Sequence, residues 1–157
     1  MAWLWRRRHH ASASVRNATP RRLVYCLPTR VLVEQTVQEA RAWLTKLDFL
    51  ATDSGSAGRI AVYQLMAGES GNDWDAWPES EAVLVGTQDQ LISRALNRGY
   101  GTSRSRWPLQ CGLLNSDALW VFDEVQLMGP AREMGCIRRP CLPVDVRDPG
   151  HVELRYP

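Results

Sequence analysis

The sequence contains no GxxxxGK[ST] segment, the glycine-rich loop that cradles nucleotide phosphates in many proteins. It has four cysteines, none of them in a CxxC pair, and His9 and His10 are adjacent instead of being spaced like metal ligands. No run approaches the ~18 apolar residues of a membrane span, and no apolar segment of a secretory signal follows the arginine-rich start. We therefore expect no membrane contact, no zinc site, and reduced thiols in a cytoplasmic protein.

Length and composition indicate one folded domain. The chain has 157 residues, of which 45% are hydrophobic, and this is enough for a sizeable core. The net charge of +2 does not point to a particular partner. Positive charge gathers near the amino terminus, and we interpret it as a solvated surface. The residues concerned are Arg6, Arg7, Arg8, Arg21 and Arg22.

The apolar pattern predicts a parallel α/β sheet, because short apolar strands alternate with helices. The strands are expected at residues 23–27, 60–65, 82–85 and 117–122. Helices are expected at residues 2–8, after Thr29, which can cap the helix, and at residues 89–96. The helix after Thr29 is expected to carry one apolar stripe, formed by Val33, Val37, Ala40, Leu44 and Leu47. Residues 9–20, 68–80 and 97–106 are expected to be loops. Residues 131–157 have several prolines and no clear period, so they predict no packed element.

The segment ALWVFDEVQ, residues 118–126, carries the strongest chemical signal. Its apolar, β-branched and aromatic residues are typical of a buried strand. Asp123 and Glu124 then lie at the carboxyl end of that strand, where ligands bind in open α/β sheets. An aspartate there can hold Mg²⁺, and a neighbouring carboxylate can orient or deprotonate water, as phosphoryl transfer requires.

Two further polar segments follow predicted strands. The first consists of Pro28, Thr29 and Arg30, and the second of Gly86, Thr87 and Gln88. Each has a purely structural interpretation, as a helix start or as a turn with a cap. Each also has a functional one, which is contact with nucleic-acid phosphates through helix amides and a guanidinium. In a parallel sheet both segments share one edge with the two carboxylates.

The order of these segments resembles a known family. YCLPTRVLVEQT, LVGTQDQLISRALNRGYG and RWPLQCGLLNSDALWVFDEVQLMG are similar to the first RecA-like domain of a superfamily-2 helicase. More narrowly, they resemble the CRISPR-associated helicase–nuclease of type I interference systems, which acts in antiviral defence. The resemblance covers roughly residues 2–130. It implies an ATP-driven translocase on single-stranded DNA, recruited to a CRISPR effector complex, with an HD nuclease domain before it and a second RecA-like domain after it.

The resemblance assigns roles to matching residues. Asp123 matches the family's Mg²⁺-binding aspartate, Glu124 its water-activating glutamate, and Gln126 a residue that couples the nucleotide to the second domain. The DNA-backbone contacts fall on Pro28, Thr29, Arg30, Gly86, Thr87 and Gln88. Mg²⁺ and ATP are thus implied as cofactors.

The departures from the family predict a fragment. Met1 stands where the family has its phosphate-binding loop, no Ser-Ala-Thr motif follows DEVQ, and the second RecA-like and HD domains are missing. We expect an α/β RecA-like (P-loop NTPase) domain truncated at both ends, with residues 1–130 as a partial helicase domain and 131–157 as a divergent, poorly structured tail. Such a helicase fragment would be inactive alone. The alternatives are one half of a split helicase, a nucleic-acid-binding module without catalysis, and an α/β protein whose carboxylates are incidental.

Overall fold

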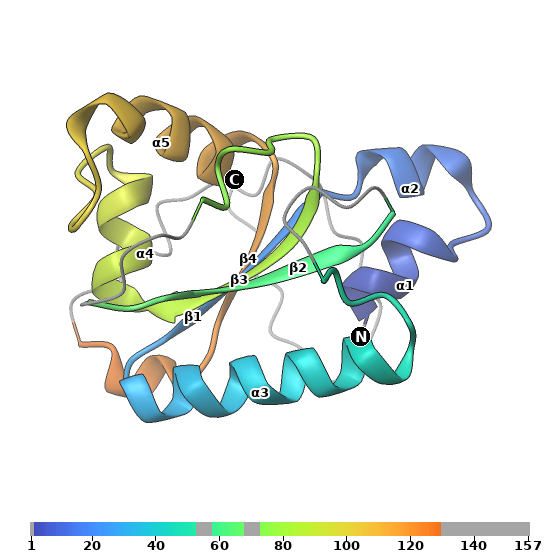
Figure 1. Ribbon diagram of the computed structural model, residues 1–157, viewed down its shortest axis with the longest axis horizontal. Helices are drawn as coiled ribbons and strands as arrows, with labels where there is room; N and C mark the ends of the chain where they lie inside the picture. Colours follow the sequence, from blue (N-terminus) through green and yellow to red (C-terminus); the bar gives the residue numbers. More distant parts are fainter. Residues whose placement is uncertain (1, 53–57, 68–72, 130–157) are drawn as a thin grey trace, which may run out of the picture.

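The computed structural model describes residues 2–52, 58–67 and 73–129, in which four parallel strands form one sheet (Figure 1). The strands are β1 (Arg22–Leu27), β2 (Ile60–Leu65), β3 (Glu81–Thr87) and β4 (Ala118–Phe122), in the order β2-β3-β1-β4. All three strand pairs are parallel, which confirms the predicted α/β class. Both a Rossmann-like and a RecA-like arrangement are consistent with this sheet.

Strand position decides how much of each strand is buried. In β3, which pairs on both sides, residues 82–86 are all buried, because helices cover both faces of an inner parallel strand. In β4 every residue is only partly buried, and among the described residues β4 pairs with β1 alone. The expectation of a buried strand before Asp123 is therefore wrong, because within the described residues β4 is an edge strand.

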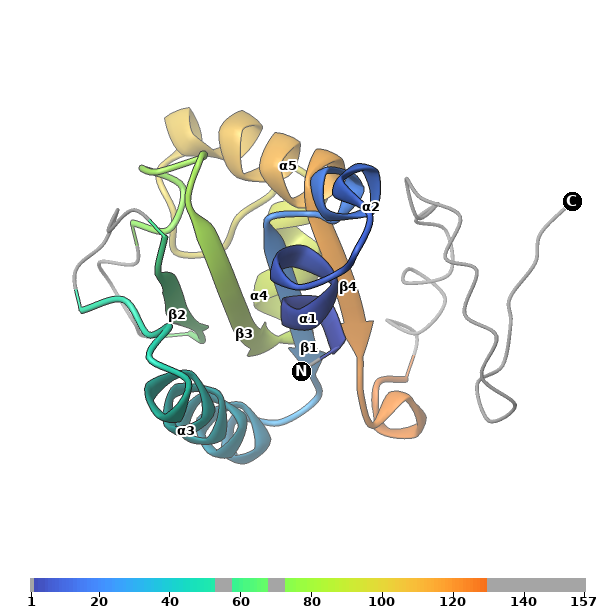
Figure 2. The ribbon, with the colours of Figure 1, turned by 90° about the vertical axis from the view of Figure 1, so that its right-hand side faces the viewer.

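Helices pack on both faces of the sheet (Figure 2). One face is covered by α3 (Arg30–Lys46) together with α1 (Ala2–Arg8), which contributes Trp3 and Leu4 to the core. The other face is covered by α4 (Gln88–Ala95) and α5 (Trp107–Ser116). The predicted apolar stripe of α3 is confirmed at Val33, Val37 and Leu44, whereas Leu47 lies beyond the helix and is exposed.

Two helices form where the sequence pattern predicts none. The helix α2 (Ala13–Ala18) buries no residue of its own, and the Arg7 guanidinium donates hydrogen bonds to two carbonyl groups at its end. The helix α5 begins with Pro108 in its first turn, a position that proline tolerates. Packing of α2 against α1 and of α5 against α4 stabilises these helices, and local propensity does not report such contacts.

Some expectations fall outside the described residues. The tail at 131–157 and its boundary at residue 130 belong to that part of the chain. Within the described ranges, no helix combines the length and the apolar character that a membrane span requires.

Candidate functional site at the carboxyl edge of the sheet

The three polar segments predicted from sequence meet at one edge of the sheet. The register pairs Leu27 with Thr87 and Cys26 with Phe122, so β1, β3 and β4 end side by side. Residues 28–30 follow β1, residues 87–88 end β3 and begin α4, and residues 123–124 follow β4. Because β1 lies between the other two strands, its loop separates the carboxylates from residues 86–88 (Figure 1). The expected common edge is confirmed.

Asp123 is held in place by three hydrogen bonds. Its backbone N–H donates to the carbonyl oxygen of Cys26 at 3.2 Å, which extends the β1–β4 ladder by one residue. The Tyr25 hydroxyl donates to Oδ2 at 2.7 Å, and the Glu124 backbone N–H donates to Oδ1 at 2.9 Å. The Asp123 side chain is exposed to solvent, so each carboxylate oxygen keeps a free lone pair. The Asp123 carboxylate therefore has a fixed orientation and is exposed at the carboxyl edge of the sheet.

Tyr25 is a site residue that sequence reasoning missed. Partial burial, followed by the hydrogen bond to Asp123 and the negative charge of that carboxylate, raises the pKa of the Tyr25 phenol to about 12. The phenol is therefore protonated at neutral pH and acts as a donor to Asp123. Tyr25 opens the segment YCLPTRVLVEQT, but the resemblance assigns it no role, and its position two residues before the end of β1 is the remaining signal in the sequence.

Glu124 and Gln126 also lie together. Glu124 has left-handed backbone angles, φ 53° and ψ 39°, which turn the chain sharply into the short 3₁₀ helix η2 (Val125–Leu127). A non-glycine residue in this region carries a cost of about 1–2 kcal/mol, so the turn is maintained by its surroundings. The Gln126 amide donates a hydrogen bond to Glu124 Oε2. The predicted catalytic residues Asp123, Glu124 and Gln126 are thus contiguous in space as well as in sequence.

The carboxylates fit a cation only in part. Among the described residues there is no group of three or more acidic, histidine or cysteine side chains that would enclose a metal ion. Mg²⁺ commonly takes one or two carboxylates together with substrate phosphates, and Asp123 with Glu124 matches that pattern. The residues present therefore suit Mg²⁺ that arrives with a nucleotide, and the phosphate loop that would hold the nucleotide does not occur in the sequence.

Two helices begin at this edge without a side-chain cap. Thr29 occupies the N-cap position of α3 and Thr87 that of α4, both with extended backbone, and neither hydroxyl accepts a capping hydrogen bond. Thr29 therefore takes the expected N-cap position, but the expected side-chain cap is not formed. The N-cap side chains leave the first-turn N–H groups of α3 and α4 uncapped, and phosphate is an acceptor that helix amino termini favour.

The side chains around these helix starts differ in accessibility. Arg30 is exposed and donates a hydrogen bond to the carbonyl oxygen of Ala67, whereas Pro28 is half-buried. The side-chain oxygen of Gln88 is buried and has no hydrogen-bond partner among the described residues. Arg30 and Thr29 are therefore the accessible members of the predicted nucleic-acid set.

Gly86 lies inside β3, so its interpretation as a turn glycine is wrong. A Cβ atom at this position would lie 2.6 Å from the Leu65 carbonyl oxygen and 2.9 Å from Leu65 Cβ. The close approach of β2 to β3 therefore requires glycine at the end of the strand. This packing role is independent of any contact with a ligand.

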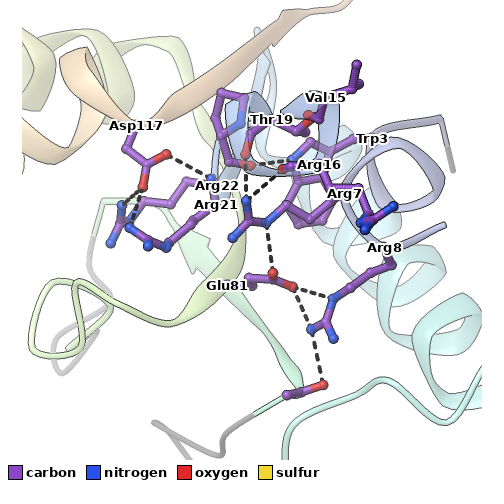
Figure 3. Close-up of polar contacts among 12 residues, drawn as sticks. Trp3, Arg7, Arg8, Val15, Arg16, Thr19, Arg21, Arg22, Glu81 and Asp117 are labelled. Atoms are coloured by element: carbon purple, nitrogen blue, oxygen red, sulfur yellow. Dashed lines mark hydrogen bonds and ion pairs between the residues drawn. The ribbon is translucent and has the colours of Figure 1, made fainter. Parts of the chain in front are cut away.

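Four of the amino-terminal arginines lie at the opposite edge of the sheet, where they bind carboxylates of this chain (Figure 3). Glu81, at the start of β3, accepts from Arg7 at 2.8 Å and from Arg8 at 2.6 Å. Asp117, just before β4, pairs with two more arginines, Arg21 at 3.5 Å and Arg22 at 3.4 Å.

The interpretation of this cluster as a solvated surface is wrong for its inner members. Arg22 is fully buried, and burial lowers the pKa of its guanidinium despite the charge of Asp117. The side chains of Arg7 and Arg8 are also mostly buried. These arginines stabilise the fold and are not available to the candidate site.

Comparisons of the chain with known protein families, with curated proteins and with solved structures found no match.

Proposed function

We propose that this chain is part of the first RecA-like domain of a CRISPR-associated superfamily-2 helicase, which acts on single-stranded DNA in the cytoplasm during antiviral defence. One observation carries the proposal: Asp123 and Glu124 lie on the same sheet edge as residues 28–30 and 86–88. A translocase needs this arrangement, because nucleotide chemistry and the DNA contacts must be coupled through one rigid sheet.

In this proposal each carboxylate has its own role. Asp123, oriented by Tyr25, is a ligand of the Mg²⁺ that accompanies ATP. Glu124, whose side chain is half-buried, activates the attacking water, and Gln126 holds the Glu124 carboxylate in position. The phosphate loop, the second RecA-like domain and the CRISPR effector complex would come from parts of the assembly beyond this sequence.

A second candidate is a single-stranded nucleic-acid-binding module without catalysis. It is favoured by the two uncapped helix starts and the exposed Arg30 at the edge, which need no nucleotide to bind phosphate. The two candidates differ in one respect, since only the helicase requires a reactive Glu124.

The 157-residue chain should neither hydrolyse Mg-ATP nor bind it with micromolar affinity. Without loop amides and the loop lysine, the β- and γ-phosphates lack most of their ligands. Titration calorimetry with Mg-ATP measures the affinity, and phosphate release with and without single-stranded DNA measures turnover. DNA-stimulated phosphate release by this chain would contradict the assignment of residues.

A rebuilt enzyme tests the helicase proposal itself. Residues 2–129 would be joined to an upstream strand with a GxGKT loop and to a downstream second RecA-like domain. The product should hydrolyse ATP with single-stranded DNA, and Glu124→Gln should abolish turnover but keep nucleotide binding, because glutamine has the same shape and is no base. Asp123→Asn should weaken Mg²⁺-dependent binding as well.

The matched control is Glu34→Gln, which removes one carboxylate from the exposed face of α3. It should leave hydrolysis at the rate of the rebuilt parent. Turnover by Glu124→Gln at the rate of the Glu34→Gln variant would refute the catalytic assignment and leave the binding module as the better candidate.

A further inference from the structure

Residues 96–106 connect α4 to α5 as a loop that ends in the short 3₁₀ helix η1 (Arg104–Arg106), and its base is fixed by hydrogen bonds. The Arg98 backbone N–H donates to the Ser93 carbonyl at 2.8 Å, and Trp107 Nε1 donates to the Thr102 carbonyl at 3.0 Å. Gly99 is buried, and a Cβ at this position would lie 3.2 Å from Arg94 Cγ. These contacts hold the loop against α4 and α5.

Arg106, at the end of the same loop, points inward. Its guanidinium donates two hydrogen bonds to the buried Asp75, through Nε at 2.9 Å and through Nη2, and one to Asp73 through Nη1 at 2.9 Å. Gln110 of α5 donates a third hydrogen bond to Asp75, at 3.1 Å. The carboxylates near the loop are therefore occupied by Arg106, and they do not neutralise the other arginines of this segment.

The remaining long side chains of the loop are exposed. Tyr100 is 63% exposed, and Arg98 and Arg104 are exposed on either side of it in the sequence. The Arg104 guanidinium lies over the Trp107 ring, 5.9 Å from its centroid. In the part of the chain that the structure describes, neither guanidinium has a carboxylate partner, in contrast to Arg7, Arg8, Arg21 and Arg22.

We propose that this arginine–tyrosine loop (Arg98, Tyr100 and Arg104) is a second contact site for single-stranded nucleic acid. An exposed aromatic ring can stack on any base, and arginines on either side can contact the flanking phosphates. This inference rests on the proposed function, which identifies the bound polymer as single-stranded DNA, and it adds a second contact site for that polymer.

The position of the loop supports a continuous path for the strand. The loop is joined through α4 to residues 86–88 at the carboxyl edge, and α4 has eight residues. At a rise of 1.5 Å per residue this helix spans about 12 Å. Figure 1 places the carboxyl edge and the loop on the same, left-hand side of the view. A strand that contacts the edge at residues 28–30 and 86–88 can therefore continue along α4 to Tyr100.

The test uses the full chain and a fluorescent oligothymidylate of roughly 15 nucleotides, a length within the range of single-strand site sizes. Tyr100→Ala should raise the Kd about 5- to 150-fold, the loss expected for one stacked base, whereas Tyr100→Phe should keep the parent Kd. Arg98→Ala and Arg104→Ala should each lower the slope of log K against log salt by about 0.7. Arg21→Ala, an exposed arginine at the opposite edge, is the charge-matched control and should change neither quantity.

The outcomes separate this inference from the proposed function. If Arg30→Ala weakens binding and the loop variants do not, the loop inference is overturned and the edge assignment stands. If the loop variants weaken binding and Arg30→Ala does not, the loop inference stands and the edge path fails. If Tyr100→Ala binds the oligonucleotide like the parent, the inference is overturned. It is also overturned if the arginine variants lose affinity equally for heparin and for the oligonucleotide, because the loop then binds polyanions in general. Absence of any binding at low salt overturns it too.

Discussion

Asp75→Asn should be among the most destabilising single substitutions in the described part of the chain. The Asp75 side chain is fully buried and accepts hydrogen bonds from Arg106 Nε, Arg106 Nη2 and Gln110 Nε2. The hydrogen bonds to Asp75, which contribute most, and to Asp73 raise the pKa of the Arg106 guanidinium. They join the segment before β3 to the start of α5. Asparagine keeps the volume but removes the charge and directs an NH₂ group toward the arginine.

The magnitude follows from burial. Hydrogen bonds to charged groups contribute about 1.5–3 kcal/mol each, and removing one member of a buried ion pair costs about 3–5 kcal/mol. The Arg106 side chain is 35% exposed, so water replaces part of what it loses. We therefore expect a decrease of about 2–4 kcal/mol in the free energy of unfolding, against the 5–15 kcal/mol typical of whole domains. At about 2–4 °C per kcal/mol for a chain of this size, Tm should fall by roughly 4–16 °C.

Asp73→Asn is the matched control, because Asp73 bonds to the same arginine but is 63% exposed. An exposed pair of this kind contributes only about 0.2–1 kcal/mol. Denaturant unfolding followed by tryptophan fluorescence measures both variants, and Trp74, which is 2% exposed and adjacent to Asp75, reports on this region. Equal midpoints for the two variants would refute the argument that burial decides the value of the pair.

The remaining predictions concern the sheet and its edge. Because the folded state raises the pKa of Tyr25 to about 12, above the usual 10.0, the unfolded chain releases this proton first. The stabilising contribution of Tyr25 is therefore complete below pH 10 and declines as the pH rises from about 10 to 12. An ultraviolet titration of the parent, compared with that of Tyr25→Phe, measures the pKa of the Tyr25 phenol. Asp123→Asn should bring this pKa closer to the usual value. Gly86→Ala should destabilise the sheet by about 1–3 kcal/mol, because its Cβ would meet the Leu65 carbonyl at 2.6 Å. Gly112→Ala in α5 should stabilise the chain by about 0.5–1 kcal/mol, because a Cβ at this position would meet nothing within 4 Å. Thermal unfolding measures both glycine variants. A higher Tm for Gly86→Ala than for Gly112→Ala would show that the Gly86 contact is relaxed at little cost.

The parallel sheet could be predicted from sequence because its strands are local apolar runs with stop signals. Pro28 and Thr29 end β1, and the acidic pair after Phe122 ends β4. Once the strands are parallel, the segments that follow them must share one edge, so the candidate site followed from chain order alone. The buried face of α3 could also be predicted, because the spacing of its apolar residues is a local pattern.

Contacts between distant segments could not be predicted, because they depend on the order and register of the strands. Tyr25 and Asp123 are 98 residues apart and meet only because β1 pairs with β4 in one particular register. Glu81 likewise binds Arg7 and Arg8, which precede it by more than 70 residues. No local sequence pattern predicts these pairs, since each of these polar side chains could equally well be exposed to solvent.

The tertiary structure also decided which segments are covered and which are free. The sequence determined that residues 118–122 form a strand, and strand order alone placed this strand at the edge of the sheet. The arginines have the same chemistry throughout the chain, yet folding buries Arg22 completely and leaves Arg98 and Arg104 exposed. A guanidinium can pair inside the protein only where the fold brings a carboxylate to it. Composition therefore determined how many positive charges the chain carries, and the packing of the helices against the sheet determined which of them are free to bind a partner.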